Sequence, residues 1–307
     1  MMMFYTTVGG WMLSYTVKSA AGAFTGLDSA GVSGVFDAML ANPGEMIGWM
    51  LAVVVVGFFV CSLGLQKGVE RITKVMMACL FVILMVLCVR SVTLPGAAAG
   101  LEFYLVPDFG KMFHGATAAE KWANFGQAVY AAMGQAFFTL SLGISAMAIF
   151  GSYIGKERSL TGEAVNIGVL DTTVALLTGL IIFPACFAFG VDPGEGPRLV
   201  FITLPSVFEH MPGSRVWGTL FFLFMSFTAL STIIAVFENI ISFCMDNWGW
   251  ARKKAVAVNA VAVALLSLPC ALGFNVLSGF SVPGIGNVQD LEDFIVSNNL
   301  LPLGSLL

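Results

Sequence analysis

The sequence carries little charge for its length. Only 10% of its 307 residues are charged, whereas 58% are hydrophobic. Soluble domains carry about 25% charged residues, so this chain has too little charge to cover the surface of a soluble globule. The net charge of -4 comes without a basic patch, which excludes a nucleic-acid binder. The high apolar content also excludes a disordered or fibrous chain.

The sequence also lacks the residue clusters that most enzymes and metal sites require. Its six cysteines lie within apolar runs and form no CxxC pair or Cys/His cluster, which argues against a zinc site or a disulfide framework. Its two histidines, His114 and His210, lie in polar intervals, and no Ser-His-Asp pattern, phosphate loop or HExxH motif occurs. We therefore predict that the protein is not an enzyme and holds no cofactor.

Apolar segments long enough to span a membrane make up most of the chain. A spanning helix needs about 20 predominantly apolar residues, so we predict an all-α, polytopic helical membrane protein with a single transmembrane domain over residues 1–307. The predicted helices cover about 1–21, 44–65, 74–95, 124–154 (broken near 141–145), 164–189, 214–245, 254–274 and 289–307. The intervals predicted as longer loops are 22–43, 96–122, 190–213 and 278–289.

Positive charge gathers in the three short links between predicted helices, at 66–74, 155–163 and 246–254. The basic residues of these links are Lys67, Arg71, Lys74, Lys156, Arg158, Arg252, Lys253 and Lys254. The longer loops are mainly acidic. Because cytoplasmic loops carry an excess of Lys and Arg, we predict that the short links face the cytoplasm and the long loops face outward.

The fourth predicted helix contains small and hydroxyl residues at its centre, where Ser141 and Gly143 favour a break. Non-helical backbone inside a membrane is tolerated where it lines a cavity, and broken helices build the substrate and ion sites of secondary transporters. The alternative is that these small residues only permit close helix packing.

The sixth predicted helix has hydroxyls on one face at Thr228, Ser231 and Thr232, spaced i, i+3 and i+4. Neutral oxygens of this kind suit a small hard cation such as sodium. The alternative is that each hydroxyl bonds the backbone carbonyl one turn back.

Three acidic residues lie in or near apolar helices, where an ionisable group marks a candidate functional site. Asp171, in the fifth predicted helix, is the best candidate for ion coupling. Glu238 either bonds neighbouring helices or lies on a transport pathway. The position of Asp246, at the end of the sixth helix, favours an interfacial residue over an intramembrane one.

Several strings across the chain together resemble the bacterial neurotransmitter:sodium symporter family of sodium-dependent amino-acid transporters, which has the LeuT-type fold. These strings are FYTTVGGW (4–11), GVERITKVMMACLFVILMV (68–86), RSVTLPGAAAGLEFYLVPDF (90–109), GQAFFTLSLGISAM (134–147), LVFITLPSVFEHMP (199–212), FTALST (227–232) and NNLLPLG (298–304). The resemblance implies a fragment of that fold, from the middle of helix 3 to the start of helix 10, truncated at both ends.

The resemblance also implies roles for individual residues. The substrate-binding residues it implies are Tyr5, Phe138, Ser141, Ile144, Thr232 and Val236. The sodium ligands it implies are Thr139, Asp171, Thr228, Ser231 and Thr232. Tyr153 and Asp246 match the cytoplasmic gate. Gln135 and Asp171 lie where chloride-dependent relatives hold an anion, and the Asp171 carboxylate would replace that anion, so we expect chloride independence.

For the full-length parent, the resemblance implies sodium-coupled symport of a neutral, hydrophobic or aromatic amino acid across the bacterial inner (plasma) membrane. Its partners would be the amino acid, sodium ions as coupling ions and the lipid bilayer. Counterparts of family helices 1 and 2 are absent, so we expect the 307-residue chain alone to be inactive. The alternatives are another ion-coupled transporter of the same fold, for a nucleobase or an osmolyte, or a non-transporting sensor or degraded gene product.

Overall fold

The computed structural model describes the chain apart from residues 64–66, 144–156, 158, 191, 193–197 and 307. Its described part is helical, without a strand and with one isolated bridge between Val282 and Gly286. The elements are α1 (Met2–Ala21), α2 (Ser29–Ala41), α3 (Pro43–Leu63), α4 (Lys67–Val92), α5 (Ala97–Leu105), α6 (Phe109–Met112), α7 (Ala118–Thr139), α9 (Leu160–Phe189), the π-helix η1 (Leu199–Thr203), α10 (Leu204–Glu209), α11 (Ser214–Trp248), α12 (Arg252–Leu272), α13 (Val288–Ile295), the π-helix η2 (Val296–Leu300) and α14 (Leu301–Leu306).

Several of these helices have the length and composition of membrane spans. Within the described residues, four qualify, in α3, α9, α11 and α12. The pair formed by α4 from Met77 onward and α5 would count as a fifth span, bent by 114°. These features are those of a multi-pass membrane protein.

Short helices lie in intervals that the sequence predicts as loops. The predicted loop 22–43 contains α2, so that prediction is wrong. The Asp28 side chain caps this helix by accepting a hydrogen bond from Gly31 N at 2.8 Å. Its buried face is formed by Val32, Phe36 and Met39, at helical spacing. Likewise, α5 and α6 lie in the predicted loop 96–122, and η1 and α10 lie in 190–213.

Helix α7 begins earlier than the sequence predicts and ends within the predicted helix 124–154. A capping box starts it, since the Thr117 side chain accepts from Glu120 N while the Glu120 side chain accepts from Thr117 N. It ends at Thr139, and Ser141 then has a positive φ of 53° and Gly143 one of 80°. The predicted break at 141–145 is described as far as Gly143, and residues 144 and 145 lie outside the described residues.

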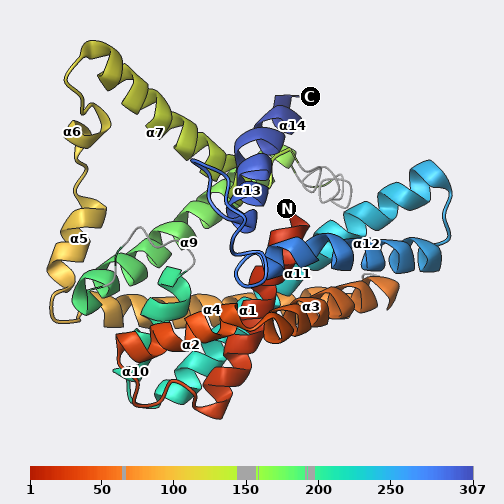
Figure 1. Ribbon diagram of the computed structural model, residues 1–307, viewed down its shortest axis with the longest axis horizontal. Coiled ribbons are helices and arrows are strands. Elements are labelled where there is room, and N and C mark those ends of the chain that lie inside the picture. The colour runs from red at the N-terminus through yellow and green to blue at the C-terminus, as the bar shows by residue number, and fades with distance from the viewer. Residues whose placement is uncertain (64–66, 144–156, 158, 191, 193–197, 307) are drawn as a thin grey trace.

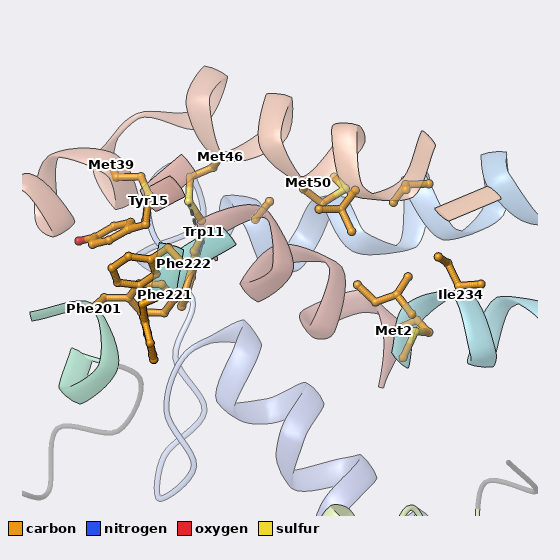
Figure 2. Packing of buried hydrophobic residues seen from close by; sticks show 14 of the residues in the cluster. Met2, Trp11, Tyr15, Met39, Met46, Met50, Phe201, Phe221, Phe222 and Ile234 are labelled. Carbon is orange, nitrogen blue, oxygen red and sulfur yellow. Dashed lines mark hydrogen bonds between the residues drawn. The ribbon is translucent and has the colours of Figure 1, made fainter. Parts of the chain in front are cut away.

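The core forms around α1, which packs against α3, α11 and α12. Figure 2 shows its aromatic part, where Trp11 and Tyr15 lie near Phe201 and Phe222. The Tyr15 and Phe201 ring centroids are 4.9 Å apart, and those of Tyr15 and Phe222 are 5.0 Å apart. Trp11 Nε1 donates to Met46 Sδ at 3.1 Å. Burial of these large rings fixes α1 between its neighbours.

The helices outside this core bring distant parts of the chain together. In Figure 1, α5, α6 and α7 run along one side of the molecule, and α9 extends from near the end of α7 to α5. Helix α9 packs against α4 and α5, while η2 and α14 pack against α7. Helix α13 also contacts α1. The end of α7, the start of α1 and residues 288–306 therefore meet in one region.

Candidate functional site

An aromatic cluster joins the start of α1 to the end of α7. The rings of Phe4 and Phe138 are stacked, with centroids 6.4 Å apart and planes at 21°. Tyr5 meets the Phe4 ring edge-on at 6.5 Å. Tyr5 and Phe138 both pack against the small apolar cluster that includes Val296 and Leu301. Two residues that the sequence predicts to bind substrate thus flank the same cluster.

Helix α11 reaches this region through Thr232. The Tyr5 hydroxyl lies near the Thr232 side chain, and Thr232 Oγ1 donates to the Thr228 carbonyl at 3.3 Å. Val236 lies one turn further along α11 and packs against the large hydrophobic core. Tyr5 on α1 and Phe138 on α7 therefore share one region, and Thr232 on α11 lies near Tyr5.

The remaining two predicted substrate residues follow α7. Ser141 lies in the turn after this helix, where Ser141 N donates to the Phe138 carbonyl at 3.1 Å. This bond places Ser141 directly beside Phe138. Ile144 lies outside the described residues.

The first predicted sodium pair is close together. Thr139 Oγ1, at the end of α7, donates to Asp171 Oδ1 on α9 at 2.9 Å. A hydroxyl and a carboxylate are hard oxygen donors of the kind that alkali and alkaline-earth cations prefer. Gln135 lies four residues before Thr139, on the same face of α7. In the described residues, no group of three His, Cys, Asp or Glu side chains could hold a metal ion.

The three hydroxyls of the second predicted sodium site all donate to backbone carbonyls of α11. Thr228 Oγ1 bonds the Phe224 carbonyl at 2.9 Å, and Ser231 Oγ bonds the Thr228 carbonyl at 2.8 Å. Thr232 bonds this same carbonyl. The alternative interpretation, in which each of these hydroxyls bonds the backbone carbonyl one turn back, therefore describes the bonds correctly. Each hydroxyl oxygen still keeps lone pairs for a cation, because it uses only its proton in these bonds.

The acidic residues of α11 differ in their surroundings. Asp246 is exposed near the end of the helix, and Tyr153, the other predicted gate residue, lies outside the described residues. Glu238 is buried, and its Oε2 pairs with Arg252 Nη2 at 2.6 Å. Arg252 Nη2 also donates to the Cys61 carbonyl at 2.6 Å. Through Arg252, Glu238 thus connects α11 to α12 and α3. A carboxylate in an apolar helix close to a basic link is the sequence signal for such an ion pair.

Comparison with known proteins gives consistent matches. A model of the Sodium:neurotransmitter symporter family matches residues 31–282. The chain is 38% identical to a Bacillus subtilis protein named uncharacterized sodium-dependent transporter YhdH, over 99% of this chain and 64% of that protein. It is 34% identical to an uncharacterized sodium-dependent transporter of Haemophilus influenzae, over 99% of this chain and 65% of that protein.

A solved structure matches as well. The crystal structure of MhsT in complex with L-phenylalanine superposes with a TM-score of 0.90 at 35% identity, covering 99% of this chain and 67% of MhsT. The chain spans just under two thirds of the length of the two sequence relatives, 64% and 65%. Family and relatives are named as transporters, not enzymes. Since the family model matches well over half of its residues, the chain belongs to the sodium:neurotransmitter symporter family and has the LeuT-type fold.

Proposed function

We propose that this chain forms part of a sodium-coupled symporter for a neutral amino acid with a hydrophobic or aromatic side chain. The observation that carries the proposal is that α7 joins a pair of oxygens shared with α9 to a pair of stacked rings shared with α1. Thr139 and Asp171 supply the oxygens at 2.9 Å, and Phe4 and Phe138 supply the stacked rings. The relative MhsT was crystallised with L-phenylalanine, which supports the same substrate class.

In this proposal, the two ends of the amino acid meet different surroundings. The Tyr5 hydroxyl can donate to the substrate carboxylate, while Phe138 covers the side chain. Ser141, Ile144 and Val236 would shape the side-chain pocket. A mostly apolar pocket with a few polar groups is typical of small-molecule sites.

Sodium would bind at two places. Thr139 and Asp171 would hold one ion, and Thr228, Ser231 and Thr232 would hold the other. Thr232 belongs to the second ion site and lies near Tyr5, so occupancy of the ion site would alter substrate binding and the reverse, which is what coupling requires. The Asp171 carboxylate would supply the negative charge that an anion provides in chloride-dependent relatives, and transport would then not need chloride.

The remaining parts of the proposal concern gating and location. Tyr153 and Asp246 would close the cytoplasmic side, and the protein would lie in a bacterial plasma membrane. We also expect the 307 residues alone not to transport, because they cover only 64% of the relative YhdH.

The test is uptake of labelled phenylalanine into membrane vesicles, with sodium outside or replaced by potassium, and with chloride or gluconate. It should be run on the 307-residue chain and on any longer product of its gene. We expect sodium-dependent, chloride-independent uptake by a longer product only. Preferential competition by nucleobases or osmolytes would favour another ion-coupled transporter, and binding without flux would favour a sensor. Robust uptake by the 307 residues alone would contradict the expected inactivity.

A further inference from the structure

Two glycines place the turn after α7 directly against α14. A Cβ atom at Gly143 would collide with the carbonyl oxygen of Leu301. Conversely, a Cβ atom at Gly304 would lie 2.7 Å from the carbonyl oxygen of Gly143. Real Cβ atoms do not approach this closely, so this backbone-to-backbone contact requires glycine on both sides.

Further contacts hold α7 against the same segment, residues 296–306. Tyr130 Oη donates to the Asn298 carbonyl at 2.6 Å. Leu301 is buried and packs in the apolar cluster that also contacts Phe137 and Phe138. Figure 1 shows this segment, with α13, beside the end of α7. The segment begins with the π-helix η2, and π-helical turns occur frequently at functional sites.

The turn itself has a conformation that needs such support. Ser141 has a φ of 53°, a left-handed value that is unfavourable for a residue other than glycine. Unfavourable backbone conformations persist where the surrounding structure holds them in place. The hydrogen bond from Ser141 N to the Phe138 carbonyl connects the turn to the aromatic cluster. The 296–306 segment is the neighbour of the turn from elsewhere in the chain.

We propose that the 296–306 segment positions the end of α7, and that Gly304 and Leu301 are positioning residues for Phe138 and Thr139. This inference rests on the proposed function, which assigns Phe138 to the substrate site and Thr139 to a sodium site. Gly304 itself contacts neither site. Its role is to let the backbone of α14 touch the backbone of the turn at Gly143.

The variant that tests the contact is Gly304→Ala. Gly304 lies within a helix, where alanine is intrinsically favourable, so the added methyl acts through the contact with Gly143 and not through backbone strain. The matched control is Gly126→Ala on α7, where a Cβ atom would meet nothing within 4 Å. Tyr130→Phe provides a second test, because it removes the bond to Asn298 without adding atoms.

The first readout does not depend on transport. Of the six cysteines, Cys79 is exposed, so Cys79→Ser with Ser141→Cys gives a background in which a maleimide reports access to the turn. We expect Gly304→Ala to raise the labelling rate about threefold or more, because local opening frees the turn. Tyr130→Phe should raise the rate less, and Gly126→Ala should leave it unchanged. An unchanged rate in both Gly304→Ala and Tyr130→Phe overturns the proposal, and Tyr130→Phe decides alone if Gly304→Ala does not fold.

The second readout is sodium-driven uptake in a transporting form of the protein with its native cysteines and Ser141. Gly304→Ala should raise the half-saturating concentrations of sodium and phenylalanine about tenfold while largely retaining the maximal rate, as expected for misplaced binding groups. Unaltered half-saturation together with unaltered labelling refutes the positioning role. Absence of uptake in every form refutes the proposed function instead, and labelling then still decides whether the segment holds the turn.

Discussion

At the scale of single residues, Asp171 combines a negative charge with a direct bond to a proposed ion ligand. Its Oδ1 accepts from Thr139 Oγ1 at 2.9 Å, between α9 and α7. The sequence alone marks Asp171 as a carboxylate in an apolar helix. Its partner is a matter of tertiary structure, because Thr139 lies 32 residues away in the chain.

Replacing Asp171 by Asn tests whether that charge serves sodium binding. We expect Asp171→Asn to raise the half-saturating sodium concentration for uptake at least about tenfold, as loss of a supporting charge does at metal sites. Chloride should then stimulate uptake, because an anion can restore the missing charge. The control is Thr173→Val, which removes a hydroxyl bonded to Val169 O of its own helix. Wild-type sodium affinity and chloride independence in Asp171→Asn would contradict the role.

The ion pair between Glu238 and Arg252 predicts an effect on stability. The Glu238 side chain is 8% exposed and that of Arg252 is 31% exposed, so Arg252→Ala leaves a buried carboxylate without its main partner. We expect a loss of about 2 kcal/mol in the free energy of unfolding, less than for a fully buried pair. Lys253→Ala, at the exposed next position, is the control and should change stability little. Thermal unfolding in detergent measures both, and equal midpoints would argue against the pair.

At the scale of helices, close crossings depend on glycines. At Gly100, a Cβ atom would lie 2.6 Å from the Cα atom of Pro184, where α5 crosses α9. Gly100→Ala therefore forces the two helices apart, and overpacking of this kind costs about 1–3 kcal/mol. Gly168→Ala, at an open position on α9, is the control. Denaturation should distinguish the two variants, and equal stability would show that the crossing adjusts freely.

The long helices could be predicted from the sequence because their hydrophobic runs reach the length of a membrane span. The helix predicted at 214–245, for example, corresponds to α11, Ser214–Trp248. Short helices such as α2 escaped prediction, because small residues and glycines in 22–43 resemble loop composition. The Asp28 cap and the packing of Phe36 and its neighbours stabilise α2. Residue types at the candidate site were predictable, whereas pairs such as Glu238 with Arg252 depend on how α11 and α12 pack.

At the scale of the whole molecule, charge and architecture together predict orientation. The first turn of α12 carries Arg252, Lys253 and Lys254 directly after the short link from α11, and both helices are candidate spans. The interval between α12 and α13 leaves the opposite end of α12 and carries Ser278. The positive-inside rule therefore assigns these two connections to opposite sides of the membrane.

This orientation predicts which positions react with a membrane-impermeant maleimide in right-side-out vesicles. Single cysteines at two exposed positions, Asn247→Cys before the α11–α12 link and Ser278→Cys after α12, in the Cys79→Ser background, mark the two sides. We expect Ser278→Cys to react in intact vesicles and Asn247→Cys to react only after permeabilisation. Cys79→Ser without an added cysteine is the control for background labelling. The reverse pattern would invert the protein and place Asp246, on the same end of α11 as Asn247, outside, where it could not act at a cytoplasmic gate.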